Sequence, residues 1–286
     1  MKNKITFSFG RNWVDYVNNS LGEEEINIAR NSLLKYLPEN EYANKVFIDI
    51  GCGSGIFSLN ALRLGCKQVI SFDVDKYSIE ATRLTKRKFS SLVPKNCQWD
   101  IFEGSVLDKS LIERLKNKAD IAYSWGVLHH TGNMYQAIRN AAQLVKPNGY
   151  FVLAIYNRAP SSDYWLEVKK FYNSAPVIIK KLMVYVTFSY IVLHRLLSIL
   201  KRKILGQPKI SLFPKDRGMS IFYDVIDWLG GYPYEYATFE EMKNFVEKLG
   251  FKLVKAPTKI PSPKKTLFNR TTLNFIGNNQ FVFKKY

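Results

Sequence analysis

The sequence predicts an α/β fold with a doubly wound, mainly parallel sheet and a mostly helical insertion before the last helix. Three observations lead to this prediction. Short apolar segments alternate with helical patterns from residue 45 to residue 157, which is typical of parallel strands joined by helices. A glycine-rich turn follows the first of these segments. The alternation stops at residue 158 and resumes at residue 238.

Five strands are expected in the alternating region. The first, KVFIDI at 45–50, is an apolar run that ends in glycine, as expected for a strand with both faces buried. The other four strands are expected at 68–74, 98–103, 119–127 and 150–156. Helical patterns separate the strands at 56–64, 77–89, 110–115 and 134–145. A Lys-Pro-Asn-Gly turn at 146–149 ends the last of these helices.

The chain completes its sheet after residue 236. Thr238, followed by Glu241 three residues later, forms a capping-box pattern that predicts a helix at 238–249. Two further strands are expected at 251–255 and 280–284. The sequence therefore predicts four parts, an N-terminal helical cap, an α/β core, a helical insertion and a C-terminal completion of the core, at 1–44, 45–157, 158–236 and 237–286.

Composition and charge limit the classes of protein to consider. The chain has 286 residues, of which 47% are hydrophobic and 23% charged, an ordinary balance for a globular protein. Its three cysteines have no CxxC spacing, so we expect no disulfide framework, no metal site and a reducing, cytoplasmic environment. The net charge is +18, of which +13 falls in residues 151–286. Such a charge favours an anionic partner, although a solvated basic surface explains it equally well.

No secretory signal is expected, because the N-terminal residues lack an apolar core. The most apolar stretch, Leu182–Leu193, has 12 uncharged residues, whereas a membrane-spanning helix needs about 20. Basic residues flank this stretch on both sides. Two interpretations stay open: a helix that packs against the protein itself, and a helix that lies on an anionic membrane surface. The second makes the protein peripheral at the inner face of the membrane.

The sequence Asp49-Ile-Gly51-Cys52-Gly53-Ser-Gly55 forms the turn after the first strand. Glycines at this place let the backbone approach a ligand at the carboxyl end of the strand. A dinucleotide fingerprint requires glycine at position 56, where this chain has isoleucine, and the Gly-Lys-Ser/Thr of a P-loop is absent. The spacing is therefore DxGxGxG, which argues against an oxidoreductase.

This turn resembles the first motif of the class I S-adenosylmethionine (SAM)-dependent methyltransferases, which have a seven-stranded Rossmann-like sheet. The resemblance covers about residues 44–157 and implies SAM as the cofactor. Asp73, which ends the second strand, matches the carboxylate that binds the ribose hydroxyls. The resemblance implies a cofactor site made of Asp49, Gly51, Cys52, Gly53, Gly55, Asp73, Val74, Ser105, Val106, Trp125 and Gly126.

One of these positions departs from the family. Methyltransferases often have Asp where this chain has Ser105, in the segment that contacts adenine, so a side-chain bond to the adenine amino group is not implied. The chain is also similar to a bacterial subgroup of the family in four short segments. These read FGxNW, WGVLHHTG, AIYN and GGYPxE, and they lie here at 9–13, 125–132, 154–157 and 230–235.

Methyl transfer by in-line displacement mainly requires positioning of the acceptor and exclusion of water. A hydroxyl acceptor also needs a base, and His130 and His129 follow the fourth strand, where ligands bind in this fold. The alternative is that one histidine caps the next helix and the other packs. Candidate residues on the acceptor side are Tyr156, Asn157, Tyr232 and Tyr234, whose rings could equally pack the insertion onto the sheet.

These observations predict a methyltransferase that acts on an oxygen or nitrogen atom of a small-molecule or lipid-linked acceptor, with the insertion as the acceptor lid. A nucleic-acid methyltransferase is the first alternative, favoured by the positive charge. It lacks support from an RNA-binding module or from an NPPY-type loop after the fourth strand. A non-catalytic SAM-binding protein is the second alternative. The sequence leaves the acceptor and the oligomeric state open.

Overall fold

A computed structural model describes residues 9–208, 211–212, 221–260 and 277–286 of the chain. Its strands are β1 (Val46–Ile50), β2 (Gln68–Asp73), β3 (Gln98–Glu103), β4 (Ala119–Trp125), β5 (Val145–Tyr156), β6 (Phe251–Thr258) and β7 (Asn278–Lys285). Its α-helices are α1 (Gly10–Asn19), α2 (Glu23–Leu34), α3 (Ile56–Arg63), α4 (Lys76–Lys88), α5 (Lys109–Leu115), α6 (Met134–Leu144), α7 (Ser162–Ser174), α8 (Val177–Ile204), α9 (Ile221–Gly230) and α10 (Phe239–Glu247).

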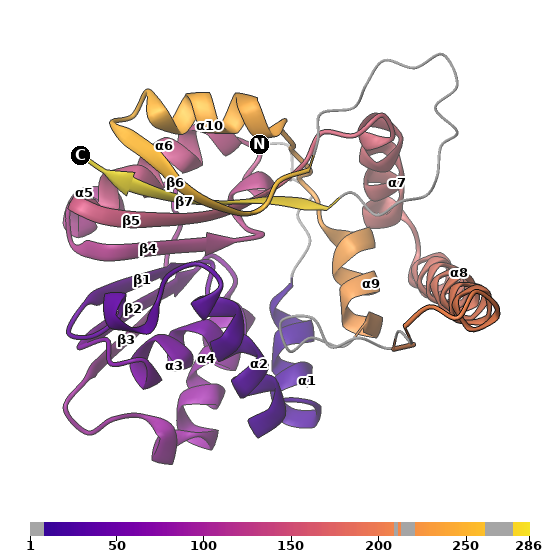
Figure 1. The fold of residues 1–286 in the computed structure, drawn as a ribbon, viewed down its shortest axis with the longest axis horizontal. Helices are drawn as coiled ribbons and strands as arrows, with labels where there is room; N and C mark the ends of the chain where they lie inside the picture. The colour runs from indigo at the N-terminus through magenta and orange to yellow at the C-terminus, as the bar shows by residue number, and fades with distance from the viewer. Residues whose placement is uncertain (1–8, 209–210, 213–220, 261–276) are drawn as a thin grey trace.

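The seven strands form one sheet in the order β3-β2-β1-β4-β5-β7-β6 (Figure 1). β7 is antiparallel to β5 and β6, and the other neighbouring strands are parallel. The strand order reverses at β1, which lies between β2 and β4, and in sheets of this kind ligands bind at the carboxyl edge beside such a switch point. The predicted doubly wound, seven-stranded Rossmann-like sheet is thus confirmed.

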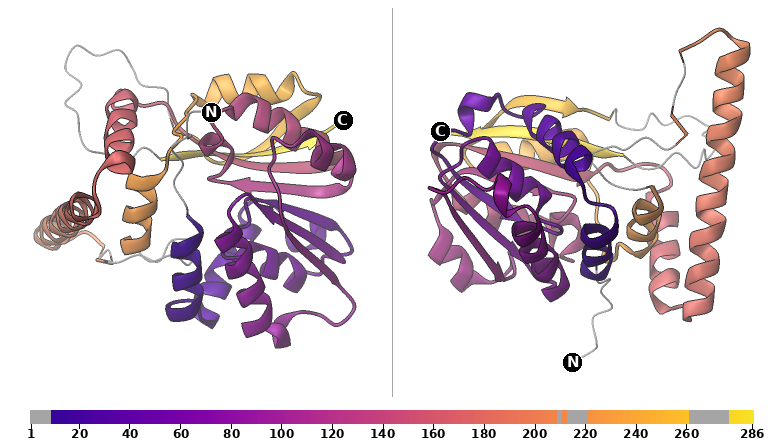
Figure 2. Two further views of the ribbon diagram at one scale, coloured as in Figure 1. Left: turned by 180° about the vertical axis from the view of Figure 1, so that it is seen from behind. Right: turned by 90° about the horizontal axis from the view of Figure 1, so that it is seen from below.

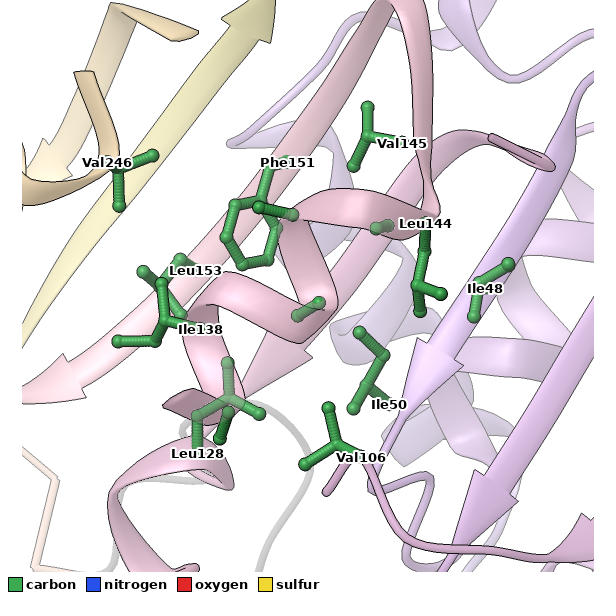
Figure 3. Packing of buried hydrophobic residues seen from close by; sticks show 14 of the residues in the cluster. Ile48, Ile50, Val106, Leu128, Ile138, Leu144, Val145, Phe151, Leu153 and Val246 are labelled. Carbon is green, nitrogen blue, oxygen red and sulfur yellow. The ribbon is translucent and has the colours of Figure 1, made fainter. Parts of the chain in front are cut away.

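Helices cover both faces of the sheet, because its strands are apolar on both sides. α5, α6 and α10 cover one face, and α2, α3 and α4 cover the other. Figure 3 shows the first interface, where Ile48 and Ile50 of β1 and Phe151 of β5 pack against Ile138 of α6. These two buried layers fix the positions of the loops at the carboxyl edge.

β5 begins five residues before the predicted strand. Val145 pairs with Ala119, and the register then shifts between Ala119 and Ile121. Asn148 has φ 61°, a left-handed conformation that asparagine tolerates better than most residues. The turn signals at 147–149 therefore lie within an irregular strand and do not mark its start.

The predicted insertion contributes α7, α8 and α9. These helices lie beyond the carboxyl ends of β4 and β5, and α8 runs along the outer side of α7 and α9 (Figures 1 and 2). A separate aromatic cluster holds the three helices together, and it includes Trp165, Tyr172, Val184, Ile191, Val225, Trp228 and Tyr234. We call α7, α8, α9 and the segment 231–236 the lid.

Candidate active site

The turn between β1 and α3 accepts only glycine at three points. Gly51, Gly53 and Gly55 have φ of 75°, 53° and 74°, a region that side-chain-bearing residues rarely adopt. A Cβ atom on Gly51 would lie 2.4 Å from Cγ1 of Val127, and one on Gly53 would lie 3.0 Å from the indole of Trp13. The turn therefore has the form predicted for a backbone that approaches a ligand closely.

Asp49 and Cys52 support this turn from inside. The Asp49 carboxylate is buried and accepts a hydrogen bond from the Ser58 hydroxyl. Thr82 donates to the Cys52 sulfur at 3.3 Å, and burial raises the pKa of that thiol well above its usual range. Both side chains thus lie behind the turn, so a direct contact of either with the cofactor stays a prediction.

Asp73 lies at the end of β2, beside the turn. Its Oδ2 accepts from the Gly53 amide at 3.2 Å, and its Oδ1 accepts from the Asp75 amide at 2.9 Å. Burial raises the pKa of Asp73 to about 6, against the lowering effect of these two bonds. A carboxylate has about four lone-pair sites. The lone pairs that these amides leave face the end of β2, and the next residue, Val74, is 71% exposed.

Gly126 and Trp125 follow β4 on the same edge. Gly126 has φ 75°, and a Cβ atom there would meet nothing within 4 Å among the described residues. The Trp125 indole donates to the Tyr36 hydroxyl at 2.8 Å, which turns it toward the face that α2 covers. Gly126 is therefore the one of the pair that borders open space.

Ser105 and Val106 follow β3. The Ser105 hydroxyl accepts from the Leu107 amide at 3.1 Å, which closes a local turn. The Val106 side chain is buried in the core, and its carbonyl accepts from the Asn140 amide at 2.9 Å. The Ser105 side chain is thus engaged in a local turn, and its contact with the cofactor stays a prediction.

α1 packs over the same edge of the sheet. The Gly10 amide donates to Asp75 Oδ2 at 3.0 Å, and a Cβ atom on Gly10 would lie 2.4 Å from the Ser78 nitrogen. This close approach brings the Trp13 indole onto Gly53. A leading helix thus lies beside the glycine turn.

His130 has one defined tautomer. Its Nδ1 lies 2.7 Å from the carbonyl oxygen of Pro233, which can only accept, so Nδ1 carries the proton and Nε2 keeps a lone pair. Burial, together with the nearby Lys169, lowers the pKa of His130 to about 3. The ring packs 5.2 Å from the ring of Phe9 and 5.4 Å from that of Tyr156. His130 is therefore a neutral acceptor of hydrogen bonds at physiological pH.

His129 is the packed member of the pair. It is fully buried, and its ring lies 4.0 Å from that of Tyr156. The Tyr156 amide donates to His129 Nδ1 at 3.4 Å, and burial lowers the pKa of His129 well below its usual range. These contacts are those of a structural histidine, so His130 is the stronger candidate for chemistry.

The four short segments that resemble the bacterial subgroup meet at this place. Asn12 donates to Asp227 Oδ1 at 2.9 Å, which ties α1 to α9. A Cβ atom on Gly231 would lie 2.8 Å from Cε1 of His130. Both oxygens of Glu235 accept from the Met134 amide, each at 3.1 Å. These contacts fasten the lid and α1 to the loop after β4.

Lys169 of α7 lies inside an aromatic box that the sequence did not reveal. The residue is fully buried, and its Nζ lies 4.1 Å from the ring centre of Trp228, 4.9 Å from that of Tyr234 and 5.9 Å from that of Tyr156. It also donates to the Trp228 carbonyl. Burial lowers the pKa of Lys169 to about 7. The burial of Lys169 could have been predicted from its spacing, because Trp165, Lys169 and Tyr172 lie on one face of a helix.

The predicted acceptor residues differ in their surroundings. Tyr156 lies beside His130, and its ring faces Lys169 together with that of Tyr234. The Asn157 side chain is buried and accepts from Asn279 at 2.8 Å, whereas Tyr232 is half-buried. The rings of Tyr156 and Tyr234 thus hold a lysine of this chain, and acceptor binding by the four residues stays a prediction.

The buried lysine makes stability depend on pH. The pKa of Lys169 is about 7 in the folded chain and 10.5 in its unperturbed state, so the unfolded chain binds more protons between these values. Stability should therefore rise with pH in this window, by about 2 kcal/mol from pH 7 to pH 9. Lys169→Met should remove this rise in urea unfolding curves. An equal rise in the wild type and the variant would contradict the burial of a titrating lysine.

The sequence profile of a methyltransferase domain matches residues 23–180. Among curated proteins, a ribosomal protein L11 methyltransferase of Hamiltonella defensa is 36% identical over 109 residues, which are 35% of this chain and 36% of that protein. Another of that name, from Pasteurella multocida, is 32% identical over 121 residues, 42% of this chain and 37% of that protein. The chain thus spans little more than a third of either relative.

Solved structures show similarity in fold. A magnesium protoporphyrin IX methyltransferase from Synechocystis PCC 6803, solved with bound SAH, aligns over 98% of this chain and 95% of its own length. The TM-score is 0.54 and the sequence identity is 14%. At this identity the similarity concerns the fold alone.

Proposed function

The chain belongs to the methyltransferase domain family, and we propose that this SAM-dependent methyltransferase acts on an oxygen or nitrogen atom of a small-molecule or lipid-linked acceptor. The observation that carries the proposal is the position of the lid. The lid packs on the neutral His130, which follows β4 at the carboxyl edge of the sheet, through the Pro233 carbonyl. The same loop touches the glycine turn, because Val127 lies against Gly51. Aromatic side chains near the acceptor suit a small or lipid-linked molecule better than an extended polymer.

The residues present fit SAM. The glycine turn leaves no room for Cβ atoms, Asp73 ends β2 with lone pairs that can accept from the ribose hydroxyls, and Gly126 borders open space. When bound, SAM supplies a methyl group on a positively charged sulfur, ready for in-line transfer. Such an electrophile needs no strong acid–base pair from the protein. Positioning and exclusion of water are what remain for this chain to provide.

His130 and the lid provide these two functions. The lone pair on His130 Nε2 can accept a hydrogen bond from a hydroxyl or amine, which orients the acceptor atom. Because the pKa of His130 is about 3, it holds a proton weakly, so orientation is its larger contribution. The bond between Asn12 and Asp227 and that between Glu235 and Met134 keep the lid closed over the edge.

A ribosomal protein is the second candidate acceptor, because the curated relatives carry that name. The family match ends at residue 180, so most of α8 and all of α9 lie outside it. The similarity thus concerns mainly the half of the chain that would bind the cofactor. The part of the chain after residue 180, which we expect to select the acceptor, does not match the family profile.

Labelled SAM tests these candidates directly. The protein is incubated with SAM carrying a radioactive methyl group and with a cell extract separated into lipid, small-molecule, protein and RNA fractions. We expect label in the small-molecule or lipid fraction. Label in a ribosomal protein would replace the proposal by the second candidate, and label in RNA would establish the nucleic-acid alternative.

Affinity for SAM should depend on pH through Asp73. The pKa of this carboxyl is about 6, and only its charged form accepts two hydrogen bonds from the ribose. The affinity should fall about tenfold for each pH unit below 6 and stay constant above it. Calorimetric titration from pH 5 to pH 8 measures this. Asp73→Asn, which cannot titrate, should bind weakly at every pH, and an unchanged pH profile in that variant would contradict the assignment.

A further inference from the structure

The outer face of α8 is apolar along most of its length. α8 has 28 residues and is therefore about 42 Å long. Leu182, Val186 and Leu193 lie along this face at helical spacing and are 61%, 60% and 57% exposed. The face continues through Leu197 and Leu200. Soluble monomers rarely leave so long an apolar strip in water.

Basic residues stand at both ends of this strip. α8 contains six basic and no acidic residues, and no acidic residue occurs anywhere from 168 to 208. Lys181 is exposed near its start, and Lys201 and Lys203 are exposed near its end. Tyr185 and Tyr190, which are exposed between them, are residues that favour the boundary between lipid and water. This composition is complementary to an anionic, partly apolar surface.

The inner face of α8 packs on the rest of the lid. Val184 and Ile191 are buried there, and the ring of Phe188 lies 5.7 Å from that of Phe222 in α9. α8 is long and apolar enough to cross a membrane by length and composition. Crossing would carry α7 into the bilayer with Glu167 and Lys170, and charged side chains are costly there. The packing therefore favours a helix that lies along a surface.

A second copy of the chain is a poorer occupant of this face. Lys180 and Lys181 lie near the start of α8, and Lys201, Arg202 and Lys203 lie in its last turn. Antiparallel pairing would place the basic start of one helix beside the basic end of the other, and parallel pairing would align identical charges. Either arrangement brings like charges together, which disfavours association.

We infer that α8 docks the protein on an anionic membrane surface. The helix lies in the plane of the membrane, with Leu182, Val186 and Leu193 among the acyl chains and the terminal lysines at the lipid headgroups. α7 and α9 then lie between the membrane and the carboxyl edge of the sheet (Figure 2). This inference goes beyond the proposed function, because it holds whatever the acceptor is.

Flotation of the full chain with lipid vesicles tests the apolar contribution. The wild type should float with phosphatidylglycerol-containing vesicles and not with pure phosphatidylcholine. A variant with Leu182→Gln, Val186→Gln and Leu193→Gln should partition at least about 10-fold less. Val254→Gln, which changes an exposed valine on β6, should float like the wild type. Retained SAM binding shows that each variant is folded.

A second variant tests the charge contribution. Lys181→Glu, Lys201→Glu and Lys203→Glu together should lower partitioning about 10-fold or more. A matched variant with Lys109→Glu, Lys118→Glu and Lys252→Glu changes the net charge equally on exposed positions outside the lid and should float normally. Raising the salt from about 0.1 M to about 1 M shortens the Debye length from about 10 Å to about 3 Å and should weaken wild-type flotation.

Four outcomes would overturn the inference, and the last of them is resistance to alkaline carbonate. The first is no flotation of the wild type at low salt, and the second is equal flotation of the apolar variant. The third is a dimer in sedimentation experiments that the apolar variant abolishes, which would assign the face to a second copy. Release of vesicle-bound protein by alkaline carbonate is expected of a surface helix, and resistance to it would show a spanning helix. None of these results depends on methyl transfer, so they do not decide the proposed function.

Discussion

Asp73→Ala should lower the affinity for SAM by about 100-fold or more. Hydrogen bonds to a charged group are worth about 1.5–3 kcal/mol each, and the variant loses two of them from the ribose. Since about 1.4 kcal/mol corresponds to a factor of ten, the loss amounts to two or more orders of magnitude. Calorimetric titration of SAM into wild type and variant at neutral pH measures this loss.

The control must separate cofactor binding from support of the turn, because Asp73 also accepts from the Gly53 and Asp75 amides. Thermal unfolding of the variant shows whether the turn and the core remain folded. Asp100→Ala removes a carboxylate of β3 that bonds Gln68 and Gln98, and it should leave the affinity for SAM unchanged. A folded Asp73→Ala variant with wild-type affinity would contradict the assigned cofactor site.

His130→Ala should lower turnover about 100-fold, because the acceptor is no longer oriented, while the affinity for SAM stays unchanged. The substitution removes the Nε2 lone pair that orients the acceptor and also the bond that fixes the Pro233 carbonyl. The loss should fall mainly on turnover, because His130 lies on the acceptor side and contacts Phe9 and Tyr156. Methyl transfer to the acceptor identified by labelling, with SAM and acceptor each varied, measures kcat and KM separately.

Two further variants complete this test. His194→Ala, an exposed histidine of α8, should have wild-type turnover. His130→Asn, whose amide can donate to the Pro233 carbonyl and offer an acceptor oxygen, should recover part of the lost turnover. If His130→Ala loses SAM binding and turnover together, His130 supports the fold of the loop and does not orient the acceptor.

The sequence predicted the sheet well because its strands are short apolar runs and its helices have clear apolar periodicity. β1, β2, β3 and β4 begin within a residue of the predicted positions. The capping box at Thr238 and Glu241 forms as predicted. Local signals such as these depend on neighbouring residues alone, so one sequence is enough to recognise them.

The direction of a side chain within an element was harder to predict. Asp49 alternates with Ile48 and Ile50 along β1 and so faces Ser58 of α3, on the same side as Phe47. The resemblance places Asp49 in the cofactor motif without saying on which side it lies. The uncharged run Leu182–Leu193 is only the middle of α8, because the helix continues through the basic residues on both sides of it.

Contacts between segments that are distant in the chain could not be predicted from the sequence. The bond from Asn12 to Asp227 depends on where α1 and α9 settle on the sheet. The aromatic box around Lys169 depends on how α7 packs against α9, because Trp228 lies in α9 and Tyr234 follows it. A lysine followed by a second lysine suggests a solvated surface, and only the packing of the lid shows that the first one is buried.

Methyl transfer by this chain requires a SAM site, which we propose lies at the carboxyl edge of the sheet, at the glycine turn and Asp73. Calorimetric titration of the wild-type chain with SAM, with S-adenosylhomocysteine and with NAD tests it most directly. We predict micromolar binding of the first two ligands and no binding of NAD, because Ile56 stands where a dinucleotide fingerprint requires glycine. Binding of NAD, or no binding of SAM and S-adenosylhomocysteine, would contradict the account.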